Sequence, residues 1–71
     1  MNRTDALENL AEGVVFSTIT PGTLKSLGFN LKEGKTFEDV ISAKHLKPGQ
    51  QPGDFDRMIA HVENNLKEII A

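Results

Sequence analysis

Histidine and carboxylate side chains are the residues of this chain best suited to bind a metal or to transfer protons. His45 and His61 lie sixteen positions apart, and Asp54 and Asp56 stand before the last apolar segment. A zinc site needs three or four convergent ligands, and neither HExxH nor a paired His spacing is present. Cys is absent, which removes thiolate ligands and disulfides. We therefore interpret both histidines as surface residues and expect neither a metal nor another cofactor.

The acidic pairs have a simpler explanation than acid–base catalysis. Glu38-Asp39 and Asp54/Asp56 fall where helices are expected to begin, and negative charge there suits the helix dipole. Catalytic carboxylates need a cleft that moves their pKa values apart. The serines and threonines show no nucleophile elbow, and the glycines match neither a Walker nor a dinucleotide spacing. The sequence predicts a protein that is not an enzyme and has no catalytic residue.

Positive charge gathers in the middle of a chain whose overall net charge is −2. Residues 25–47 carry a net +2, whereas the segments on either side carry −2 each. The candidate contacts to an anion or a nucleic acid are Lys25, Lys32, Lys35, Lys44 and Lys47. Two short predicted helices in this region make a helix-turn-helix-like DNA-binding regulator the alternative function. Glu38 and Asp39 at the start of the second helix oppose it, because they repel phosphates.

The elements that would position these residues are separated by Pro-Gly dipeptides, which favour turns. All three prolines are followed by Gly, at positions 21, 48 and 52. We expect one helix from Thr4 to Glu12 that stops at Gly13. A second runs from Pro21 to Leu27 after the cap Thr20 and stops at Gly28. A third begins at Thr36, where Asp39 resembles the second residue of a capping box, and ends before Pro48.

The segment Val14–Ile19 permits two interpretations. Its branched and aromatic residues favour a strand, for which Phe29–Leu31 is the plausible partner. It also fits the last turns of a longer first helix, since Gly13 would cost that helix only about 1 kcal/mol. We favour the strand, although a lone two-stranded ribbon is marginal in water.

The strongest pattern is the apolar spacing of the last helix, expected over residues 54–70 and capped by Asp54. A polar Pro/Gly connector, residues 47–53, precedes it. Spacings of four, three, four and three place its apolar residues on one helical face. This predicted interaction face consists of Phe55, Met58, Ile59, Val62, Leu66, Ile69 and Ile70. Such a face must be buried, either on the other helices of the same chain or on a partner.

Length and composition place these elements in one small domain, residues 1–71. We predict a mainly α fold of four short helices, with a minor two-stranded β-ribbon as the α+β alternative. The core of so short a chain rarely supplies more than about 3–5 kcal/mol, and oligomerisation is a common remedy where disulfides are missing. No apolar run approaches the roughly 18 residues of a membrane span, and no secretory signal is evident.

The sequence therefore predicts a small non-enzymatic interaction protein in the cytoplasm, with no membrane contact. It would act as an adaptor, inhibitor or regulator. Its partner would be an identical subunit, a larger protein, or both. The last helix would make the contact.

Overall fold

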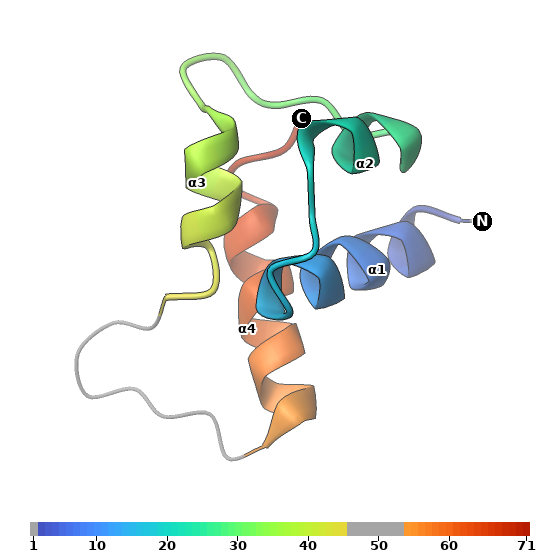
Figure 1. Ribbon diagram of the computed structural model, residues 1–71, viewed down its shortest axis with the longest axis vertical. Helices are drawn as coiled ribbons and strands as arrows, with labels where there is room; N and C mark the ends of the chain where they lie inside the picture. Colours follow the sequence, from blue (N-terminus) through green and yellow to red (C-terminus); the bar gives the residue numbers. More distant parts are fainter. Residues whose placement is uncertain (1, 46–53) are drawn as a thin grey trace.

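Four α-helices make up the fold of the part of the chain that the structure describes (Figure 1). The computed structural model describes residues 2–45 and 54–71. The helices are α1 (Arg3–Val15), α2 (Pro21–Ser26), α3 (Phe37–Ser42) and α4 (Phe55–Leu66). The predicted mainly α architecture of four short helices is confirmed. The predicted connector 47–53 lies outside the described residues.

Local side-chain caps set the beginnings of the helices. The Thr20 hydroxyl accepts a hydrogen bond from the Thr23 N–H at 3.2 Å before α2. At α3, the Thr36 N–H donates to the Asp39 carboxylate at 2.8 Å, the reciprocal arm of a capping box. These caps satisfy N–H groups that the first helical turn leaves without partners. The helix starts predicted at Pro21 and after Thr36 are confirmed.

Helix α1 is longer than predicted and includes the first two residues of the segment that we favoured as a strand. Val14 and Val15 are its last two residues, so the ribbon between Val14–Ile19 and Phe29–Leu31 is wrong. Val14 is 2% exposed and continues the helical period of the buried Leu10, so burial outweighs β propensity. Gly13 does not stop the helix. A Cβ there would make ordinary van der Waals contact with the Cβ of Ile19 at 3.4 Å, so the returning chain does not require glycine at this position.

The extended segment after α2 pairs with the last residues of the chain instead. Leu31 and Ile70 form an isolated antiparallel bridge. The Lys32 N–H donates to the Ile69 carbonyl, and the Ala71 N–H donates to the Asn30 carbonyl, both at 2.8 Å. This pairing explains why the last helix ends at Leu66 rather than at residue 70. After Leu66 the chain tightens into a turn and becomes extended at Ile70.

Helix α3 also ends earlier than predicted. It stops at Ser42, and Ala43 is its C-cap. The Asn65 side chain on α4 donates a 2.8 Å hydrogen bond to the Ala43 carbonyl, which fixes the end of α3 against α4. Figure 1 shows α3 beside the later half of α4.

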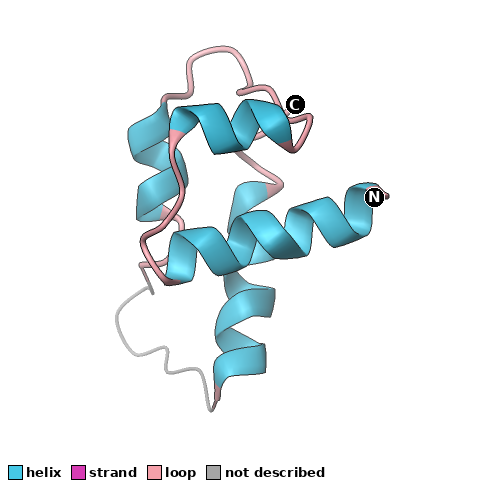
Figure 2. Ribbon diagram, turned by 45° about the vertical axis from the view of Figure 1, so that its right-hand side comes forward, coloured by secondary structure: helices cyan, strands magenta, loops and turns pink. Residues whose placement is uncertain are grey.

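The main contact between helices is that of α1 with α4. Figures 1 and 2 show α1 lying across α4, and α2 on the same side of the molecule as α1. The core draws residues from all four helices and from the segments that follow them: Ala6, Leu10, Ala11, Val14, Leu24, Phe29, Val40, Ala43, Ile59, Val62, Leu66, Ile69 and Ile70. The radius of gyration, 11.5 Å, is close to the roughly 11 Å expected of a compact chain of this length. Within residues 2–45 and 54–71, no helix combines the length and apolarity needed to cross a bilayer.

Candidate interaction surface

The predicted interaction face divides into a buried and an exposed part. Five of its seven residues belong to the core of the chain itself: Ile59, Val62, Leu66, Ile69 and Ile70. They stabilise the fold and are not displayed on its surface. Phe55 is 47% exposed, and Met58 is half-buried against the core. The part of this face that a partner could reach is therefore the first turn of α4.

Phe16, immediately after α1, lies against this exposed part of α4. Its ring centroid is 5.3 Å from that of Phe55, and the two ring planes are tilted by 34°. Phe16 is 61% exposed. The separation lies within the range of roughly 4.5–7 Å at which aromatic rings attract each other. The two rings thus form an aromatic pair that joins the end of α1 to the start of α4 and remains largely in contact with solvent.

An unusual helix end sets the position of Phe16. Phe16 is the C-cap of α1, and Ser17 follows with a φ of +59°, the left-handed region that glycine usually occupies. The Ser17 N–H donates to Val14 and the Thr18 N–H donates to Gly13, at 3.2 and 2.9 Å. This is the hydrogen-bond pattern of a Schellman motif. The Lys44 ammonium donates to the Ser17 hydroxyl at 2.9 Å.

A conventional cap positions Phe55. The Asp54 carboxylate accepts a hydrogen bond from the Arg57 N–H at 2.9 Å, as the sequence predicted. Phe55 is the first residue of the helix after this cap, and the first buried residue of α4 is Ile59, one turn later. Phe55 therefore projects beyond the region that α1 covers.

A shallow groove continues the apolar surface on the other side of Phe16. It has a volume of about 270 Å³. Its apolar walls include the half-buried Ile19 and Leu27, and Glu12 and Thr18 give it a polar rim. We define the aromatic surface as Phe16, Phe55, Ile19 and Leu27. The sequence analysis missed Phe16, because a strand at 14–19 placed it in a sheet. The signal that would have found it is the helical spacing of Leu10 and Val14, which carries α1 to its end.

The lysines proposed to contact anions lie at different places on the described part of the chain. Lys25, Lys32 and Lys35 line three different hollows. Lys44 binds Ser17, and Lys47 lies outside the described residues.

The histidines have packing partners instead of metal-binding neighbours. The His61 ring nitrogen Nε2 lies 3.0 Å from the Asn65 amide and 3.3 Å from the His45 carbonyl. No group of three His, Cys, Asp or Glu side chains suited to a metal ion occurs among the residues described. Asn65 and His61 thus belong to the contact that holds the end of α3 on α4.

Comparison with known proteins adds no functional assignment to this geometry. Searches against family models, curated proteins and solved structures found no significant match.

Proposed function

We propose that this chain is a small non-enzymatic interaction protein of the cytoplasm, and that it forms a homodimer through its aromatic surface. In that form it would act as an adaptor, inhibitor or regulator of a larger protein. The observation that carries the proposal is the Phe16–Phe55 pair, whose rings contact each other and yet remain 61% and 47% exposed. Exposed apolar patches of this kind are typical of association sites, and aromatic residues dominate the energetics of interfaces.

The available area indicates a weak association. A standard interface buries about 800 Å² on each partner, roughly a sixth of the 4717 Å² of surface on this chain. Two phenylalanines with Ile19 and Leu27 cover only part of that area, so polar neighbours must complete the contact. We therefore expect a dimer with a dissociation constant of about 10–100 µM rather than a permanent one.

Sedimentation velocity over about 10–500 µM protein tests the proposal, because that range spans the expected dissociation constant. The wild type should shift from monomer to dimer across it. The double variant Phe16→Ser/Phe55→Ser should stay monomeric, since it removes the apolar area at little cost to the core. Its matched control, Phe16→Leu/Phe55→Leu, keeps apolar side chains at both positions and should still dimerise.

A monomeric wild type at every concentration would refute the homodimer. Equal dimerisation of the serine variant would instead refute the aromatic surface as its contact. DNA binding by the lysine-rich segment remains the alternative function. It predicts a salt-dependent shift of labelled duplex that is insensitive to both phenylalanine substitutions.

A further inference from the structure

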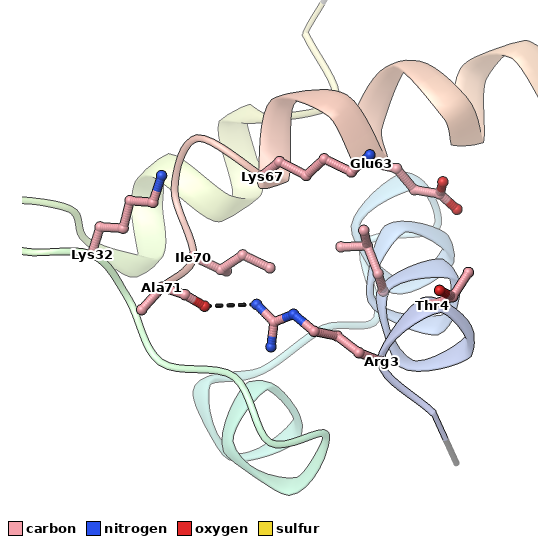
Figure 3. Close-up of a pocket in the computed structure, with 8 residues that line it drawn as sticks. Arg3, Thr4, Lys32, Glu63, Lys67, Ile70 and Ala71 are labelled. Carbon is pink, nitrogen blue, oxygen red and sulfur yellow. Dashed lines mark hydrogen bonds between the residues drawn. The ribbon is translucent and has the colours of Figure 1, made fainter.

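A basic groove lies at the opposite ends of the two helices that carry the aromatic pair. It runs between the first turns of α1 and the last turn of α4, where residues 32 and 70–71 close one side (Figure 3). Its volume is about 480 Å³, within the range of roughly 300–1,000 Å³ that small-ligand sites occupy. The groove is lined by Arg3, Thr4, Leu7, Lys32, Glu63, Lys67, Ile70 and Ala71.

The charge of this groove is opposite to that of the chain. Arg3, Lys32 and Lys67 face one anionic side chain, Glu63, so the lining side chains carry a net +2. The whole chain has a net charge of −2. Three of its eight basic residues are thus gathered around one hollow, together with only one of its ten acidic residues. Clefts lined by one sign of charge raise the local concentration of oppositely charged ligands.

Arg3 is held in place before any ligand arrives. Its Nη2 donates a 2.6 Å hydrogen bond to the main-chain oxygen of Ala71, and its Cζ lies 4.8 Å from the centre of the Phe29 ring. A guanidinium has five N–H donors, so further donors remain after this bond. A fixed donor loses less conformational entropy on binding than a free one.

Lys32 and Lys67 are the uncommitted cations of the groove. Both side chains are exposed, and within the described residues neither ammonium group takes part in a hydrogen bond or ion pair. Figure 3 shows Lys32 and the Arg3 guanidinium on either side of the Ile70 side chain, and Lys67 extending along α4 toward Glu63. The floor is apolar, because Ile70 is buried and Leu7 is half-buried. A ligand that uses all of these groups must combine an anionic head with an apolar body.

We propose that this groove binds a small organic anion with an aliphatic body. Lys32, Lys67 and the remaining N–H groups of Arg3 receive the carboxylate or phosphate head. Leu7 and Ile70 receive the aliphatic part. The site is independent of the homodimer, since neither phenylalanine of the aromatic surface lines it.

Titration of ¹⁵N-labelled full chain with four probes at constant ionic strength tests the proposal. Hexanoate and hexyl phosphate carry both features, hexanol lacks the charge, and acetate lacks the aliphatic body. At least one of the first two should bind with a dissociation constant of about 1–10 mM, the affinity usual for ligands of so few atoms. The amide signals of Lys32, Lys67 and Ile70 should shift most. The bound probe identifies the head group.

Charge variants locate the site. Lys32→Gln/Lys67→Gln should weaken the binding about tenfold, the combined effect of two exposed charge contacts. Lys25→Gln/Lys35→Gln changes the net charge equally but alters lysines that line other grooves, so it should weaken binding less than about twofold. Hexanol binding as tightly as hexanoate, equal losses in both double variants, or no saturable shift with any probe would each overturn the proposal.

Discussion

Ser17 shows how one residue governs the placement of the aromatic surface. Its φ of +59° closes the Schellman motif that leaves Phe16 beside Phe55. A non-glycine residue in this region carries a conformational penalty of about 1 kcal/mol relative to glycine. The Lys44 hydrogen bond to its hydroxyl is exposed and offsets only part of that penalty.

Substitution of Ser17 separates the backbone from the hydroxyl. Both Ser17→Gly and Ser17→Ala lose the hydrogen bond to Lys44, but only glycine adopts a positive φ without strain. We expect Ser17→Gly to be more stable than Ser17→Ala by about 1 kcal/mol. Urea denaturation of the two variants measures the difference through their midpoints. Equal midpoints would show that the conformation at residue 17 is not under strain.

At the scale of elements, the sequence predicted where helices begin better than where they end. Thr20, Thr36 and Asp54 cap their helices through residues three positions away, so the information is local. The end of α1 depends on the burial of Val14 in the core, and the end of α4 depends on the bridge between Ile70 and Leu31. Neither contact is visible in a local window. The same limit hid Phe16, whereas Phe55 was predicted from the period of its own helix.

The buried residues of helix α4 stabilise the fold. Leu66 is fully buried, and Leu→Ala substitutions at such sites cost about 3–5 kcal/mol. A core of this size rarely supplies more than about 3–5 kcal/mol in total, so we expect Leu66→Ala to be largely unfolded at 25 °C.

Far-UV circular dichroism with urea titration measures the effect of Leu66→Ala. The control is Phe55→Ala on the same helix, which removes a larger but half-exposed side chain and should cost less than about 1.5 kcal/mol. A cooperative Leu66→Ala transition near that of the wild type would mean that α4 does not pack as described.

At the scale of the whole molecule, contacts between distant segments close the fold. Arg3 and Ala71 are 68 positions apart, and the Leu31–Ile70 bridge brings the last residues beside the segment after α2. Nothing in the spacing of residues predicts these contacts. Of the cations in the basic groove that they shape, only Lys32 was therefore predicted from the sequence as a contact to an anion. The other two cations of the groove are Arg3 and Lys67. They come from the first and last segments of the chain, each of which has a net charge of −2.

Hydrogen exchange tests whether this closure is part of the cooperative fold. The Lys32 and Ala71 amides donate to Ile69 and Asn30, so both should be protected. Arg3→Gln removes the bond to Ala71 and the contact with Phe29, and should speed exchange at these two amides about tenfold. The Leu10 amide in α1 should change much less.

The control is Arg57→Gln, the same substitution at the exposed arginine of α4, which should leave all three exchange rates unchanged. If Arg3→Gln instead accelerated Leu10 as much as Ala71, residues 69–71 would unfold together with the helices and would not form a separate unit. If it accelerated none of them, Arg3 would contribute only charge to the groove, and the position of Ala71 would rest on the bridge alone.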